Sequence, residues 1–269
     1  MDDIQNQNSE TDLDIDKVGV TSITYPLRVK SKSSVTQDTI AKISMFVSLP
    51  KHFKGTHMSR FISILNKHNS LIDVGNFKVI MRDILIALDA ESSYIKLEFP
   101  YFIKKKAPIS GEEGLMDYGC VFLGYADNKN GIETTAIVKV PITSVCPCSK
   151  AISDRGAHNQ RGVVEVKFLT HGTGIWIEDI IELVENSASC GLYPMLKRPD
   201  EKWVTETAYD NPLFVEDIVR SVAKKLIELG LDTFKVSVTN YESIHNHSAY
   251  AEINRGKFKT VKGDNNNDG

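Results

Sequence analysis

The chain has 269 residues, 41% hydrophobic and 25% charged, a composition typical of a globular protein that buries a core without disulfides. Its formal net charge is −3, but the first sixteen residues hold six acids and no base, which leaves 32 bases against 29 acids over residues 17–269. That excess is too mild for a nucleic-acid binder, and the chain has no apolar run of about 20 residues that could span a membrane. We therefore expect neither nucleic acid nor membrane as a partner.

Both ends of the chain are predicted to lie outside the folded part. Residues 1–17 form an acidic tail and residues 259–269 a second tail rich in Asn and Gly, and we expect both to be disordered. The start, Met1-Asp2-Asp3, has no basic or apolar signal region, so no secretory signal is expected. Four cysteines are too few for a disulfide framework, which favours a reduced, cytoplasmic protein.

The apolar spacing of the first half predicts alternating strands and helices. In chain order these are a strand over 40–49, helices over 58–67 and 77–88, a strand over 95–99 and a hairpin over 121–145. We expect Thr56 or Ser59 to cap the first helix. The hairpin should turn at residues 128–131, because its Asn-Gly pair is a strong hairpin signal.

The second half repeats this order. It predicts a strand over 163–168, helices over 176–184 and 211–230, and strands over 234–238 and 249–253. Asn211 followed by Pro212 is typical of a helix start and Gly230 of a helix end, while residues 197–203 are expected to form a charged loop. The fold class is therefore α+β, with two modules, residues 18–145 and 146–258, each with antiparallel strands and two helices.

The densest chemical motif is Cys146-Pro147-Cys148, which follows a strand and is itself followed ten residues later by His158. A disulfide across one residue would be strained, whereas thiolate and imidazole together suit Zn²⁺. Fewer than four protein ligands would leave an open, catalytic metal site. The alternative is that the two thiols are small buried side chains beside a surface histidine.

Other polar motifs allow a functional and a structural interpretation. Glu242, His245 and His247 lie in a loop that could hold a metal or an acid–base pair, or could be a polar turn. Glu216 lies in the first turns of a helix, where the macrodipole stabilises a carboxylate without any function. Arg60, beside His57, could contact phosphate or be plain surface charge. No phosphate-binding loop, dinucleotide fingerprint or nucleophile elbow is present.

Taken together, the motifs resemble the type IB GTP cyclohydrolase family. Six segments carry the resemblance in the same order over residues 18–258: Gly55-Thr56-His57-Met58-Ser59-Arg60-Phe61, Val145-Cys146-Pro147-Cys148-Ser149-Lys150, Gly156-Ala157-His158-Asn159-Gln160-Arg161, Lys197-Arg198-Pro199-Asp200-Glu201, Asn211-Pro212-Leu213-Phe214-Val215-Glu216-Asp217 and Glu242-Ser243-Ile244-His245-Asn246-His247-Ser248-Ala249. The resemblance implies a tunnelling fold, two such modules per chain forming a barrel-like homotetramer with active sites at subunit interfaces.

The resemblance also implies the activity. GTP and water would give 7,8-dihydroneopterin triphosphate and formate, the first step of tetrahydrofolate and, in some bacteria, queuosine biosynthesis. Guanine C8 is a poor electrophile and water a poor nucleophile, and a divalent metal can lower the pKa of its water to about 7. A Cys, His and Glu set would accept Zn²⁺, Mn²⁺ or Fe²⁺, so the sequence leaves the metal open.

Site residues follow from the same resemblance. The metal ligands would be Cys146, His158 and Glu201, with Asp200 and Glu206 as neighbours that leave the last assignment open. Glu216 would anchor guanine, Glu242 and His245 would form the acid–base pair, and Cys148 would lie beside the metal. The candidate contacts to the triphosphate are Lys150, Arg161, Arg60 and His57, some of them from a neighbouring subunit.

Two alternatives stay open at this point. An archaeal relative on the same scaffold, which prefers Fe²⁺, would give 7,8-dihydroneopterin 2′,3′-cyclic phosphate with almost the same residues. The second alternative is a non-enzymatic pterin- or purine-binding module with a structural zinc. It would keep its metal when a chelator is added and would release no formate from GTP.

Overall fold

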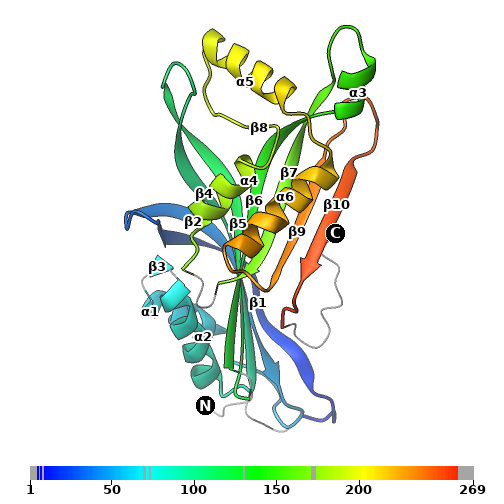
Figure 1. Ribbon diagram of the computed structural model, residues 1–269. Helices are drawn as coiled ribbons and strands as arrows, with labels where there is room; N and C mark the ends of the chain where they lie inside the picture. Colours follow the sequence, from blue (N-terminus) through cyan, green and yellow to red (C-terminus); the bar gives the residue numbers. More distant parts are fainter. Residues whose placement is uncertain are drawn as a thin grey trace.

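The computed structural model describes residues 5, 7, 9–68, 71–72, 74–129, 131–170 and 174–259. Across these residues the strands form one sheet in the order β10-β9-β7-β6-β5-β4-β2-β1-β3, and β8 pairs with β6 beside this path (Figure 1). The paired strands are antiparallel except for the short β1–β3 pair. The α+β class predicted from the sequence is confirmed.

Apart from the two-residue strands β3 and β8, the strands are longer in the first half of the chain than toward its end. Their bounds are β1 Ile15–Lys30, β2 Thr36–Leu49, β3 Leu71–Ile72, β4 Ser92–Lys106, β5 Glu113–Asp127, β6 Gly131–Val145, β7 Asn159–Leu169, β8 Cys190–Gly191, β9 Phe234–Asn240 and β10 Ala249–Arg255. The helices are α1 Met58–Lys67, α2 Val74–Leu88, α3 Pro147–Ile152, α4 Ile177–Glu185, α5 Arg198–Asp210 and α6 Val215–Glu228.

Helices α2 and α4 pack on the same face of the sheet, as alternate residues of β5 show. Cys120 and Gly124 point to one face because side chains four apart on a strand share a side. A Cβ atom at Gly124 would lie 2.9 Å from a ring carbon of Phe77 on α2, while the Tyr118 hydroxyl donates to Glu185 on α4 over 2.8 Å. One apolar core therefore runs under both helix pairs, α1–α2 and α4–α6 (Figure 1).

Most elements predicted from apolar spacing are confirmed. The first predicted helix coincides with α1, the predicted 121–145 hairpin lies in β5 and β6, and the loop at residues 241–248 separates β9 from β10. β1 is a strand that the sequence patterns missed, and it begins inside the segment expected to be a tail. Asn130 of the expected turn, residues 1–4, 6 and 8, and residues 260–269 of the expected second tail lie outside the described residues.

The segment before the last long helix was predicted wrongly. Residues 198–210, expected to begin as a charged loop, form helix α5, and Asn211 is the residue that ends it rather than the start of the next helix. The Asn211 side chain donates to the carbonyl of Ala188 over 2.9 Å, so its amide supports a neighbouring turn. Helix α6 starts at Val215, capped by the carboxylate of Asp217.

Two further details differ from the predictions. The residue before α1 is His57, and neither Thr56 nor Ser59 caps the helix, since the N-cap makes no side-chain hydrogen bond. The second half of the chain carries four helices within the described residues instead of two, because α3 and α5 add to α4 and α6. No helix in the part of the chain that is described combines the length and the apolar character that crossing a membrane requires.

A largely but not fully buried ion pair ties the sheet to α4. The Lys105 ammonium on β4 lies 2.8 and 2.9 Å from the two carboxylate oxygens of Glu185, and the two side chains are 12% and 17% exposed. Tyr118 donates to the same carboxylate, and burial together with this charge raises the pKa of its hydroxyl, which stays protonated. The Lys105 ammonium also lies 4.5 Å from the ring centre of Tyr193 and donates to the carbonyl of Leu192.

We expect Glu185→Ala to lower the free energy of unfolding by about 3 kcal/mol, because it leaves a buried ammonium without its counter-charge. Urea denaturation followed by circular dichroism measures this. The matched control is Glu228→Ala, which removes the exposed partner of Lys224 and should change stability by less than about 0.5 kcal/mol. Equal effects of the two substitutions would contradict a structural role for the buried pair.

Candidate functional site

The candidate site lies at the corner where β6 ends and β7 begins. Val145 pairs with Asn159 in the antiparallel register, so the residues that follow and precede them, Cys146 and His158, are neighbours. The Cys146 amide donates to the His158 carbonyl over 3.1 Å. The ladder of β6 and β7 thus continues one step beyond the strands and makes Cys146 and His158 neighbours along the backbone.

Helix α3 and Ser149 fix the thiol side of this corner. Cys146 is the N-cap of α3, and its sulfur accepts the Ser149 amide over 3.5 Å. The Ser149 hydroxyl donates to the Cys146 carbonyl over 3.1 Å and accepts the amide of His158 over 3.2 Å. Ser149 therefore clamps both ends of the loop. Cys148 lies one residue into α3 and is exposed.

The His158 ring is tied to a second strand pair through Gln160. Its Nδ1 lies 3.0 Å from the Gln160 side-chain oxygen, and the Gln160 amide nitrogen donates to a Glu242 carboxylate oxygen over 3.3 Å. The Ser243 hydroxyl lies 3.4 Å from the same Nδ1. The structure thus brings Cys146, His158 and Glu242 into one connected network.

The loop over residues 241–248 carries the predicted acid–base pair. The Tyr241 amide donates to the Arg161 carbonyl over 2.9 Å, which anchors the start of the loop to β7. Glu242 is half-buried and contacts Gln160, whereas His245 is exposed and stacks on His247 with ring centres 5.0 Å apart. Within the described residues, the side-chain contacts therefore join Glu242 to Gln160 and His245 to His247, and do not join the predicted pair to each other.

Helix α5 separates the two adjacent carboxylates that the sequence left as alternatives. Asp200 is fully buried and accepts the amides of Ile109 and Ser110 at 2.8 Å each, the Ser110 hydroxyl at 2.6 Å and the Lys197 amide at 2.9 Å. Burial alone would raise the pKa of Asp200, but these donors hold it well below its usual range. Asp200 is therefore occupied as a structural cap, and Glu201 is the exposed carboxylate.

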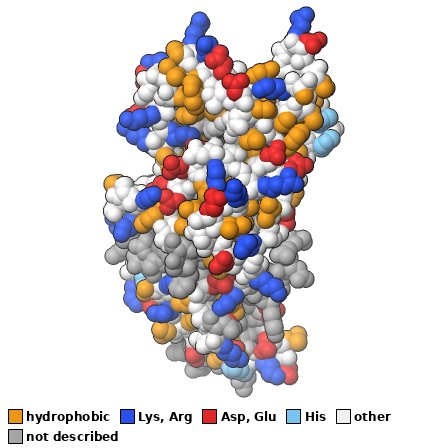
Figure 2. Space-filling view, in the orientation of Figure 1, with side chains coloured by type: hydrophobic (Ala, Val, Ile, Leu, Met, Phe, Trp, Pro, Cys, Tyr) orange, Lys and Arg blue, Asp and Glu red, His pale blue; other side chains and the backbone are white. Residues whose placement is uncertain are grey.

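The start of α6 is attached to the same corner. The Leu213 amide donates to the Val145 carbonyl over 3.1 Å, and the Ser144 hydroxyl donates to the Leu213 carbonyl over 2.9 Å. Glu216, the second residue of α6, is exposed three positions further on. In Figure 2 the surface is hollowed between the projections that α5 and the α3 segment form, on a face where Lys and Arg are interspersed with Asp and Glu.

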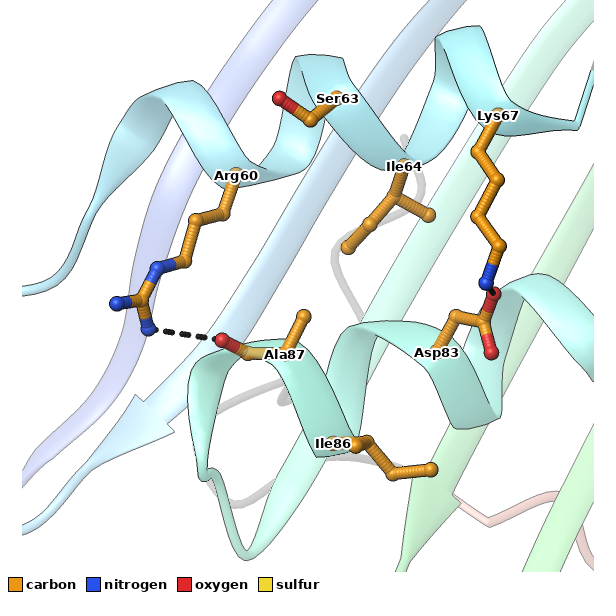
Figure 3. Close-up of a pocket in the computed structure, with 7 residues that line it drawn as sticks. All are labelled: Arg60, Ser63, Ile64, Lys67, Asp83, Ile86 and Ala87. Atoms are coloured by element: carbon orange, nitrogen blue, oxygen red, sulfur yellow. Dashed lines mark hydrogen bonds and ion pairs between the residues drawn. The ribbon is translucent and has the colours of Figure 1, made fainter.

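The predicted phosphate contacts fall into two separate groups. Lys150 donates to the Tyr209 carbonyl at the end of α5, with its ammonium 4.2 Å from the Tyr209 ring centre, and Arg161 is exposed on β7. His57 and Arg60 lie at α1, at the far end of the sheet from α3 (Figure 1). Figure 3 shows Arg60 donating across a shallow pocket to the Ala87 carbonyl, over 2.8 Å. One chain does not bring the two groups together.

The residues at the corner fit a divalent metal in part. Cys146 is half-buried and its sulfur accepts an amide hydrogen bond, and pairing of His158 Nδ1 with an oxygen leaves Nε2 for a metal. Over the described residues, however, no three His, Cys, Asp or Glu side chains cluster closely enough to hold an ion. Two of the three predicted ligands are therefore adjacent, and Glu201 is not beside them.

No role was predicted from the sequence for Ser149, Gln160 or Ser243. All three stand inside the quoted motifs, and a sequence signal existed for Gln160. Residues two apart on a strand face the same side, so an amide two positions after a metal-ligand histidine at a strand start should lie beside the ring. The hydroxyl contacts depend on the loop path and have no such signal.

Comparisons with known proteins agree with the motif analysis. A family model described as Type I GTP cyclohydrolase folE2 matches residues 1–251. The chain is 53% identical over 260 residues to GTP cyclohydrolase FolE2 of Methylobacillus flagellatus, covering 96% of this chain and 97% of that protein. It is 53% identical over 257 residues to GTP cyclohydrolase FolE2 2 of Dechloromonas aromatica, covering 95% and 94%.

A solved structure shares the fold. A hyperthermostable mutant of the urate oxidase of Bacillus sp. TB-90 superposes with a TM-score of 0.51 at 10% identity, covering 89% of this chain and 99% of that one. At this identity the similarity concerns the arrangement of strands and helices alone.

Asp200→Asn should destabilise the protein at neutral pH and much less in acid. Because the folded-state pKa is lowered, the carboxylate contributes stability above its ordinary pKa of about 4 and loses it as the pH falls further. Thermal unfolding of metal-free protein from pH 3 to 7 measures the difference, with Glu206→Gln on the exposed side of α5 as control. A pH-independent difference would contradict a cap that acts through its charge.

Proposed function

Since the chain belongs to the type I GTP cyclohydrolase FolE2 family, we propose that it is a GTP cyclohydrolase that converts GTP and water to 7,8-dihydroneopterin triphosphate and formate, in folate biosynthesis. The observation that carries the proposal is the adjacency of Cys146 and His158 at the β6–β7 corner, joined to Glu242 through Gln160. Neither a cyclic-phosphate product nor a non-enzymatic module is favoured by any relative. The four free cysteines are consistent with a cytoplasmic location.

Cys146, His158 and Glu201 would hold a divalent metal. When bound, Zn²⁺, Mn²⁺ or Fe²⁺ supplies Lewis acidity, which makes water a usable nucleophile toward guanine C8 at neutral pH. Cys146 contributes a sulfur at the N-terminus of α3 and His158 contributes Nε2. Because α5 keeps Glu201 away from this pair in the single chain, we propose that the ligand set is completed in the assembled homotetramer.

Glu242 and His245 move protons in this proposal. His245, on the exposed loop, protonates the imidazole nitrogen of the guanine and returns protons during ring opening. Glu242 is held at the base of the loop by Gln160. Its carboxylate would accept a hydrogen bond from the other ring nitrogen of His245 and so orient that ring. Cys148, exposed on α3 two residues after Cys146, would lie beside the metal in this proposal.

Glu216 would anchor the guanine. Its position in the first turn of α6, near the positive end of the helix dipole, stabilises the ionised carboxylate. A carboxylate there can accept hydrogen bonds from guanine N1–H and from the 2-amino group. Adenine offers neither donor in that arrangement and would strand a desolvated carboxylate, a penalty of roughly 1–3 kcal/mol. The bonds of Leu213 to β6 place this helix start at the site corner.

The triphosphate needs cations from two places. Arg161 and Lys150 lie at the β6–β7 corner of one chain, whereas His57 and Arg60 lie at the other end of the sheet. We propose that His57 and Arg60 reach the triphosphate from a neighbouring subunit, which requires the homotetramer with its sites between subunits.

Cys146→Ala should abolish formate release from GTP and lower bound metal together, because it removes one of the ligands. Metal content by mass spectrometry and the fluorescence of the oxidised pterin, measured after reconstitution with each metal in turn, test this. Cys148→Ala, which removes the exposed thiol two residues away, should keep the metal while turnover falls. Full metal content in Cys146→Ala would show that the ligand assignment is wrong.

Glu216→Gln should weaken GTP binding by about tenfold or more while metal content stays unchanged. The guanine N1–H and 2-amino group need two acceptor oxygens, and the glutamine amide replaces one of them with an NH₂ donor. Equilibrium binding of a non-hydrolysable GTP analogue to the metal-loaded protein measures this. Asp217→Asn, on the same turn but engaged in capping α6, separates a binding loss from a helix effect. Unchanged affinity in Glu216→Gln would remove its anchoring role.

A further inference from the structure

Gln160 joins the two halves of the site with the two ends of one amide. It lies at the start of β7, is 7% exposed, and faces the same side of the strand as His158, two residues earlier. Its oxygen lies 3.0 Å from His158 Nδ1 and its nitrogen lies 3.3 Å from a Glu242 oxygen. The residue thus spans from a proposed metal ligand to a proposed proton-transfer group.

The charge of Glu242 decides which way this amide points. An ionised carboxylate can only accept hydrogen bonds, so the NH₂ end of Gln160 must face Glu242, and the carbonyl end must face His158. A carbonyl oxygen can in turn only accept, so the proton of the neutral imidazole must be on Nδ1. Nε2 then keeps its lone pair, the form of the ring that coordinates a metal through Nε2.

The backbone contacts of His158 alone do not fix the orientation or the tautomer of its imidazole ring. Ser149 holds the His158 amide and Cys146 holds its carbonyl, which places the residue but leaves the ring free to rotate. The Ser243 hydroxyl, 3.4 Å from Nδ1, can donate or accept and therefore selects neither tautomer. In the described part of the chain, the side-chain contacts of the His158 ring come from Gln160 and Ser243. Of these two, only Gln160 has its orientation fixed by a further partner, the Glu242 carboxylate.

We propose that Gln160 is a positioning residue that, under the direction of Glu242, holds the proton of His158 on Nδ1 and presents Nε2 to the metal. The inference rests on the proposed function in one respect, the role of His158 as a ligand. It adds that the proton-transfer side of the site, through Glu242, also controls the geometry of the metal side. Gln160 does this without touching substrate or metal.

The first test reads the ring directly. In the metal-free full-length protein, long-range ¹H–¹⁵N NMR assigned with a His158→Ala variant should show His158 protonated at Nδ1. Gln160→Met, which keeps the size and removes both hydrogen bonds, should give a mixture of tautomers. Gln160→Glu, which keeps an acceptor for Nδ1–H, should restore the Nδ1 form. An Nδ1 form that persists in Gln160→Met would overturn the inference.

The second test measures metal affinity by competition between the protein and a chelator for Zn²⁺. Gln160→Met should weaken binding by roughly 10- to 100-fold, the range for partners that orient metal-ligand histidines. Gln160→Glu should bind Zn²⁺ close to the wild-type value but turn over GTP more slowly, because its carboxylate repels Glu242. An equal loss of Zn²⁺ affinity in Gln160→Met and Gln160→Glu would contradict the proposal that the residue 160 oxygen orients His158.

Gln37 provides a matched control for Gln160. Gln37 also uses both ends of its amide, donating to the Phe102 carbonyl over 3.2 Å and accepting the Phe102 amide over 2.8 Å, on strands away from the site. Gln37→Met should change neither the His158 tautomer nor Zn²⁺ affinity. If the wild-type protein shows the Nδ1 form but binds no metal and releases no formate, the proposed function fails while the role of Gln160 in orienting the ring stands.

Discussion

The site depends on one constraint, the antiparallel register of β6 and β7. Val145 opposite Asn159 makes Cys146 and His158 the next pair, and the bond from the Cys146 amide to the His158 carbonyl closes it. A shift of one residue would send every side chain of β7 to the other face of the sheet. The imidazole would then leave the thiol, and Gln160 would leave Glu242. The register of β6 and β7 therefore fixes the positions of Cys146 and His158 relative to each other.

Around this pair, the other candidate residues come from elements attached to the corner by one or two hydrogen bonds each. Helix α6 is tied through Leu213, the loop carrying His245 through Tyr241, and the end of helix α5 through Lys150. The start of α5 is held instead to the β4–β5 loop, through Asp200. Such attachments fix where each element starts and leave its exposed carboxylate or imidazole free to meet a ligand.

The sequence predicted local structure where the apolar period was strong and failed where long-range contacts decide. Helix α1 was found from its own spacing. Helix α5 was missed because few of its residues are apolar, and because its first turn depends on Asp200, whose donors include Ser110, ninety residues away in the chain. Strand β1 was missed because its pairing with β2 creates its order. Contiguous motifs, in contrast, pointed to neighbouring positions for Cys146 and His158, since that adjacency needs only one hairpin-like return of the chain. Their role as metal ligands stays a prediction.

The contrast between Asp200 and Glu201 shows what a sequence motif cannot separate. Two adjacent carboxylates in one charged segment are chemically equivalent until the helix turns one of them inward. Four donors surround Asp200, which saturates its oxygens and removes it as a ligand, whereas Glu201, about 100° further around the helix, stays exposed. The same donors fix α5 to the β4–β5 hairpin and so determine where the Glu201 carboxylate can go. The buried acid therefore fixes the position of its exposed neighbour, Glu201, on the surface of α5.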